Sequence, residues 1–523
     1  MSDEDADENG WSPTRRAAVM ALWTWVAFAG LAGVAFVASG GMGEGWPTGY
    51  LGGVLSVLTF GFGVSAQAGG PAFVVALTSL GPTLVLVLEV VVLTALLYRG
   101  LVALGEGDEL AGQVGLVLAY LGAVPAVAWV IGFLWVGGST PLPVGGLAGS
   151  ATGPLSYWPA ALALSIPLAA AFGRLRLRAA ERRDWVLDGW LFVSWLLGSL
   201  VVVEAAAGVD GLGTLALRGG VNDDFPVLLS ALALFVVFAL LASVGRELAW
   251  SSTDGGVAAR AATEADGGSG LTRAALLRDV VTESPRVKVG LVGLGLSVLV
   301  GGVAMAVVAP AAATRGPVWA VPLALAAVAP TALLAWVVAT ATGVGLGLVA
   351  TRASGGRTVA GGAWFVANVP LLVWFYLTVV ATDASTTTPA GLPTAVLAVS
   401  VAPLVGVVVA SALAGAGEAS AAAAEATAPT ASAEQFLPVV GTAAVCAAVV
   451  VLVVAQARGL AGIAPSGELW AVFATRRLSG IVLRFGLGVG IPVVSLLLVG
   501  DGLREYVREQ HTRGPAKPDW VDR

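Results

Sequence analysis

Residues that could do chemistry are few in this 523-residue chain, and most stand alone. Glu89 lies within the apolar run 84–97 and has four apolar neighbours on each side. A carboxyl group is costly in lipid, so an intramembrane glutamate is a functional candidate that could carry a proton or a cation. The alternative interpretation is a protonated or hydrogen-bonded glutamate with a structural role.

Two further polar residues are weaker candidates for a binding site. Glu204 lies near the predicted outer end of an apolar stretch, where an interfacial position is the simpler interpretation. Asn368 comes two residues before Pro370. Its side chain could satisfy a carbonyl that the proline leaves free, or it could bind a ligand.

The residue inventory excludes several kinds of catalytic site. His511 is the one histidine and lies in a polar tail, while Cys446 is the one cysteine and lies in an apolar run. Paired-histidine haem ligation, Cys/His zinc sites and Ser-His-Asp catalysis therefore lack their residues. Neither lysine follows the glycine that a P-loop requires. We expect no catalytic residues, no metal, no cofactor and no nucleic-acid partner, and thus a protein that is not an enzyme.

Composition predicts an all-α, polytopic helical membrane protein. Hydrophobic residues make up 57% of the chain and charged residues only 11%, against about 25% charged in soluble proteins. The lipid bilayer is the natural solvent for so apolar a chain, and other membrane proteins are its further expected partners. Its acidic N-terminus, its net charge of -6 and a preference for arginine over lysine are typical of salt-loving microbes.

About twelve apolar stretches are long enough to cross a bilayer, which takes roughly 20 helical residues. An additional apolar run, 50–68, is interrupted by glycines. The predicted transmembrane helices are 17–38, 72–98, 113–136, 157–173, 187–207, 226–244, 288–311, 318–350, 359–381, 392–415, 437–456 and 480–500.

The distribution of arginine predicts the topology in the plasma membrane, because cytoplasmic loops are enriched in basic residues. The densest basic cluster, 174–183, is therefore predicted to be cytoplasmic, as are both termini. This topology requires 50–98 to make one net crossing, so we interpret the segment 44–70 as a re-entrant or interfacial insertion. The basic residues of 457–485 fall on the predicted outer side, against the rule.

The one long hydrophilic segment divides the chain into two halves. Residues 1–244 form the first transmembrane half, 245–287 a cytoplasmic linker, and 288–523 the second half. Within the linker, Leu276, Leu277, Val280 and Val281 share one helical face, which predicts an amphipathic helix on the membrane surface. The alternative is a solvated linker helix.

A repeated pattern suggests that the two halves arose by duplication. Tyr120-x4-Pro125-x3-Trp129 recurs as Phe365-x4-Pro370-x3-Trp374, and a Ser-Pro pair followed by basic residues precedes the first span of each half. Parallel repeats of this kind are a known transporter architecture. We therefore predict a parallel six-plus-six arrangement.

The same residues resemble the Yip1 family of small polytopic membrane proteins. The resemblance consists of Ser284-Pro285-Arg286, a long apolar helix and the aromatic-x4-Pro motif from Phe365 to Pro370. It implies a membrane organiser or adaptor, in tandem, since family members are about half this length. The small-GTPase binding of eukaryotic members is not implied, because no GTPase-contact motif is present. The alternative function is a small-solute or ion transporter, or a permease subunit, with Glu89 as its intramembrane carboxylate.

Overall fold

The computed structural model describes somewhat more than half of the chain, and every regular element in that part is a helix. Five of these helices are long and apolar enough to cross a membrane. The all-helical class is therefore confirmed for the described residues, and these apolar helices are consistent with a membrane-embedded protein. The described residues are 46–122, most of 124–133, 157–178, 182–221, 224–251, 278, 280–308, 320–352, most of 437–452, 483–513 and a few positions in 18–30.

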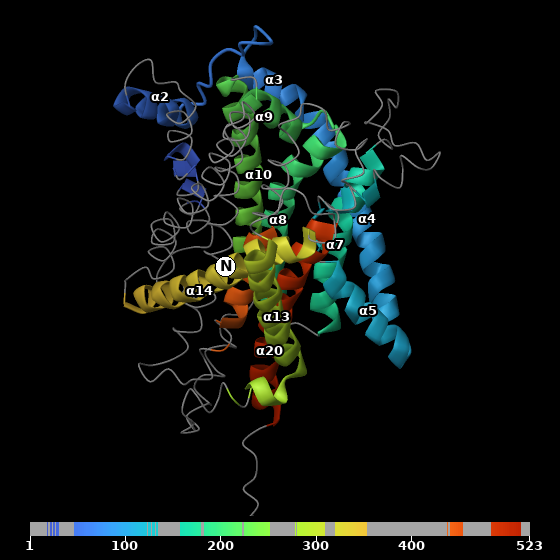
Figure 1. The fold of residues 1–523 in the computed structure, drawn as a ribbon. Helices are drawn as coiled ribbons and strands as arrows, with labels where there is room; N and C mark the ends of the chain where they lie inside the picture. The colour runs from blue at the N-terminus through green and yellow to red at the C-terminus, as the bar shows by residue number, and fades with distance from the viewer. Residues whose placement is uncertain are drawn as a thin grey trace, which may run out of the picture.

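A first group of helices comes from the N-terminal half (Figure 1). α4 lies along α7, α5 folds back against both, and α8, α9 and α10 pack on one another. Glycines permit the closest approaches: a Cβ added to Gly115 of α5 would lie 2.8 Å from the backbone nitrogen of Gly105. The bounds are α3 Ala72–Thr78, α4 Leu80–Gly105, α5 Glu109–Leu121, α7 Trp158–Leu177, α8 Arg182–Ala207, α9 Leu212–Val221 and α10 Phe225–Ser251.

A second group comes from the C-terminal half. α13 (Pro285–Val308) packs along α20 (Gly490–Arg513) and against α14 (Ala320–Arg352). The π-helical turn η7 (Arg484–Val489) continues directly into α20. The short apolar helix Val440–Leu452 is buried from residue 441 to its end. Among the described helices, the closest packing between the two groups is that of α5 on α20.

Proline marks where several of these helices begin. Pro159, Pro226 and Pro285 all lie in the first turn of α7, α10 and α13. A backbone N–H in the first turn has no intrahelical acceptor, so a proline there costs no hydrogen bond and its fixed φ suits the helix. The apolar runs that predicted these spans therefore begin close to where the sequence placed them.

The predicted insertion 44–70 contains a short helix followed by a tight loop. α2 (Trp46–Leu58) has 13 residues, fewer than the ~20 needed to cross a bilayer. After it, Phe60, Gly63 and Gly69 adopt positive φ angles, and Val64 pairs with Pro71 in an isolated antiparallel bridge. Whether this segment is re-entrant or interfacial stays a prediction.

The structure describes only some of the residues on which the other predictions depend. In the predicted linker helix, 280–283 are helical and Val280 is buried, whereas Val281, assigned to the same face, is 36% exposed. Phe365, Pro370 and Trp374 lie outside the described residues, so the duplication stays a prediction, as does the count of twelve spans. Residues 457–482 also lie outside them.

The two ends of the helix bundle differ in chemistry. At one end, the C-terminal ends of α4, α7 and α20 meet the start of α13, through Arg176–Glu106 and Arg286–Glu505 pairs. At the opposite end, the turn before α9 meets the start of α4, where the Leu212 N–H donates to Thr83 Oγ1 at 2.8 Å. We call these the charged end and the α9 end.

Candidate functional site

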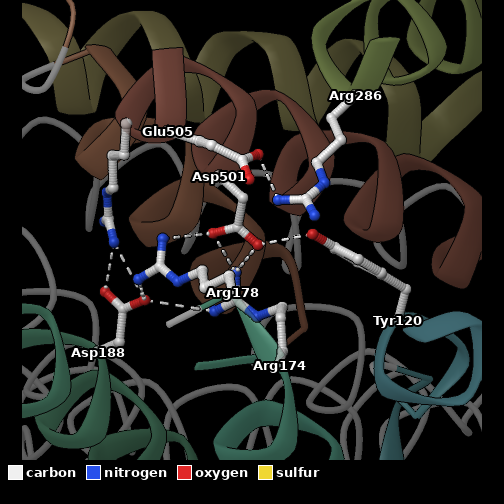
Figure 2. A network of polar contacts seen from close by, with 8 residues as sticks. Tyr120, Arg174, Arg178, Asp188, Arg286, Asp501 and Glu505 are labelled. Carbon is white, nitrogen blue, oxygen red and sulfur yellow. Dashed lines mark hydrogen bonds and ion pairs between the residues drawn. The ribbon is translucent and has the colours of Figure 1, made fainter. Parts of the chain in front are cut away.

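A network of buried charged side chains lies at the charged end, between the two helix groups (Figure 2). Arg174 comes from α7, Arg178 is the C-cap residue of that helix and Asp188 comes from α8, while Asp501 and Arg504 come from α20. Each of these five side chains is less than 10% exposed. We call them the interhalf network, because they link residues more than 300 positions apart.

Asp501 is the acceptor at the centre of this network. Arg174 donates from one terminal nitrogen to both carboxylate oxygens at 2.7 Å. Arg178 donates to Oδ1 at 2.9 Å, and the hydroxyl of Tyr120 in α5 donates to Oδ2 at 2.8 Å. Three side chains of the first helix group therefore converge on one carboxylate of the second group.

Asp188 forms the second acidic position and closes the network. Arg504 donates to its two carboxylate oxygens at 3.0 and 3.1 Å, and Arg174 and Arg178 each donate to Oδ2 at 3.3 Å. Arg174 and Arg178 thus bridge both acids. The guanidinium groups of Arg174 and Arg178 each donate to two carboxylates at once. A planar guanidinium group allows this geometry, whereas an ammonium group does not.

Helical spacing explains how these residues reach one another. Arg174 and Arg178 are four residues apart at the end of α7, and Asp501 and Arg504 are three apart on α20, so each pair lies on one helical face. The Arg174 guanidinium also lies over the Phe192 ring, 5.7 Å from its centroid. This contact with α8 adds a cation–π interaction that orients the guanidinium.

A second ion pair borders the network. Arg286, in the first turn of α13, donates to Glu505 on α20, and both side chains are about a quarter exposed. Figure 2 shows Arg286 on the same side as Tyr120, above the Asp501 carboxylate. The charged end therefore joins helices α5, α7, α8, α13 and α20 through polar contacts.

Burying these charged side chains costs free energy. Removing charges from water costs several kcal/mol per ion, and the pairing offsets that cost only when hydrogen bonds are well formed. Replacing such a network by apolar residues is often neutral, so its main contribution is to select one arrangement of the helices. In the described residues no group of three or more histidine, cysteine or acidic side chains could hold a metal ion.

The site residues predicted from sequence are not part of the interhalf network. Glu89 is partly buried on the flank of α4, and its Oε2 has no hydrogen-bond partner among the described residues. Glu204 lies at the α9 end and is fully buried. Asn368 lies outside the described residues.

The network itself was not predicted from sequence. Arg174 and Arg178 were interpreted only as markers of a cytoplasmic loop, and Arg504 as part of a basic tail. The helix instead continues through Asp501 and Arg504 to Arg513, about a dozen residues beyond the predicted span. The available signal was the i, i+3 spacing of an acid and an arginine directly after an apolar run.

No family model, curated protein or solved structure matches this chain. The Yip1 resemblance therefore stays a prediction.

Proposed function

We propose that this protein is a non-enzymatic membrane organiser or adaptor, the role that the Yip1 resemblance implies. The observation that carries the proposal is the interhalf network. Its acids and arginines form ion pairs with one another, buried between helices of both groups. Such a cluster favours one arrangement of the helices that carry it.

The outward faces of the spanning helices support the same proposal. Leu88 on α4, Val292 on α13 and Val337 on α14 are each about 60% exposed. Side chains of this kind suit contact with lipid tails or with apolar helices of other membrane proteins. These apolar faces could therefore contact other membrane proteins, as an organiser would.

Photo-crosslinking in native membranes tests this role. A photoreactive phenylalanine analogue at Leu88 or Val292 should give a discrete crosslink to another protein, whereas the buried Val450 should give none. Crosslinks to lipid alone at both exposed positions would contradict the adaptor role. The control at Val450 reports crosslinking that arises from misfolded chains.

A transporter of small solutes or ions is the second candidate. The observation that favours it is that the described helices form two groups that meet through polar contacts. In many transporters two such halves rock against each other during transport. The transporter proposal also includes the parallel six-plus-six repeat and the twelve membrane spans predicted from sequence. Proteoliposomes loaded with pH-sensitive and cation-sensitive dyes should show no proton or cation flux if the protein is an organiser. They should show measurable flux if it is a transporter of such ions.

We also propose that the charged end faces the cytoplasm of a plasma-membrane protein, with both termini on that side. In a Cys446→Ala background, cysteine at Asp108 lies at the charged end, and cysteine at Ala66 lies in the loop before α3; both positions are exposed. A membrane-impermeant maleimide should label Ala66→Cys and spare Asp108→Cys in intact cells. The opposite pattern would show that the topology is inverted.

A further inference from the structure

A second buried polar site lies at the α9 end, far from the interhalf network along α8. Glu204 of α8 is fully buried, and its carboxylate lies against the first turn of α9. The Gly213 N–H donates to Oε2 at 2.6 Å. The Thr214 N–H also faces this carboxylate. The Thr83 hydroxyl, which accepts from the Leu212 N–H at 2.8 Å, lies beside it.

The backbone around this carboxylate leaves no room for larger residues. A Cβ added to Gly211 would lie 2.5 Å from Glu204 Oε2 and 2.6 Å from Thr83 Oγ1. A Cβ added to Gly213 would lie 2.9 Å from the same Oε2. The two glycines therefore allow α9 to begin directly against the carboxylate.

Two oxygen atoms in this site have no partner among the described residues. The Oε1 atom of Glu204 is buried and accepts no hydrogen bond, and the Oγ1 atom of Thr214 is buried and forms none. Thr214 is only 7% exposed, and its own N–H already faces the carboxylate. A buried polar atom without a partner is costly, and in native proteins it usually has a ligand or a water.

The chemistry of these atoms defines the ligand. All are oxygens, from a carboxylate and hydroxyl groups, and oxygen ligands prefer hard cations. Only one formal negative charge is present in the set, so a monovalent ion would balance it, while a divalent ion would leave an uncompensated buried charge.

We propose that Glu204, Thr214 and Thr83 form a binding site for a monovalent alkali-metal cation at the α9 end. The cation binds Glu204 Oε1 and Thr214 Oγ1, and it ties the start of α9 to α8 and α4. This proposal does not depend on the organiser role, since a bound cation can stabilise either an organiser or a transporter.

Thermal unfolding of the full chain in detergent tests the site. LiCl, NaCl or KCl is exchanged for choline chloride at constant total chloride. For the wild-type chain, at least one of the three cations should raise Tm saturably, by roughly 2–4 °C, because a ligand that binds only the folded state stabilises it. Glu204→Gln should lose this rise, and Thr214→Val should need a higher cation concentration to reach it.

A matched control and a direct measurement make the test decisive. Glu106→Gln removes an exposed carboxylate at the charged end and should keep the full cation-dependent rise. If Glu204→Gln does not fold, equilibrium dialysis of the wild-type chain with sodium-22 or rubidium-86 should show about one saturable ion per chain, reduced in Thr214→Val. The site is refuted if Tm in choline equals Tm in all three cations, if Glu204→Gln keeps the rise, or if dialysis shows no saturable ion.

Discussion

The inner helices α7 and α20 contrast with the outer helices α4 and α13. In α7 and α20, 72% of the membrane-spanning window is buried inside the protein, against 22% in the window that includes α4 and 28% in α13. The inner helices carry Arg174 and Asp501, whose charges are paired across the two groups. The outer helix α4 carries Glu89, whose Oε2 has no partner among the described residues.

This difference shows that burial in protein, and not hydropathy, decides which charges a membrane helix can hold. All four helices are apolar enough to be predicted as spans. On an inner helix, a charge can meet a partner from another segment, so it can be both buried and satisfied. On an outer helix the neighbour is lipid, so a charge must be neutral or lie near water.

Asp501→Asn should produce the largest effect. Losing the carboxylate leaves Arg174 and Arg178 buried with Asp188 as their shared acid, and breaking a buried charge pair typically costs about 3–5 kcal/mol. The apparent free energy of unfolding, from SDS titration in dodecylmaltoside, measures the loss.

An exposed ion pair at the same end is the control for Asp501→Asn. Glu106→Gln breaks the Arg176 pair, in which both side chains are more than half exposed, and should cost less than about 1 kcal/mol. If the two variants lose equal stability, the interhalf network does not hold the helix groups together.

Gly301→Ala should have the next largest effect, because it tests close packing within one group. The added Cβ would lie 2.5 Å from the backbone nitrogen of Ala326 on α14, so α13 and α14 must separate, at a cost of about 1–3 kcal/mol. The neighbouring Gly302 faces open space, and Gly302→Ala should be neutral or slightly stabilising. Equal Tm values for the two variants would mean that α13 and α14 do not pack as described.

Tyr120→Phe should have a smaller effect, of about 1–2 kcal/mol. It removes one hydrogen bond to the Asp501 carboxylate and leaves the arginine pairs in place. A double-mutant cycle with Asp501→Ala isolates that bond, since alanine has no acceptor and the Tyr120 effect should then shrink by more than half. An unchanged effect would assign the role of Tyr120 to packing alone.

Sequence patterns identified the helices but not the contacts between them. The apolar runs predicted α7 and α13 closely, because each run is long and ends in arginine, proline or glycine. The predicted span 480–500 ended too early, because Asp501 was taken as the end of the apolar segment. In the structure α20 continues, since Arg174 and Arg178 supply the partners that a lone aspartate lacks.

The candidate residues illustrate the same limit of sequence reasoning. Glu89 was conspicuous because its neighbours are apolar, yet its Oε2 has no hydrogen-bond partner among the described residues. Glu204 was a weak candidate, and its environment depends on Thr83, a residue more than 100 positions away. Contacts of that separation have no periodic signature in one sequence, so only the fold reveals them.

Glu89→Leu should have the smallest effect, and it tests the outer-helix side of the comparison most directly. Glu89 lies on the flank of α4, beside the buried Val90 and the exposed Leu88, and desolvation is not offset by a hydrogen bond to Oε2. An apolar side chain suits that position better, so Tm in detergent should be unchanged or slightly higher. Glu89→Gln keeps the shape and removes the charge, so it should behave like the wild-type chain. If Glu89→Leu strongly lowers Tm while Glu89→Gln does not, Glu89 is an essential hydrogen-bonding group. An outer helix would then hold a satisfied polar residue, and the contrast with α7 and α20 would fail.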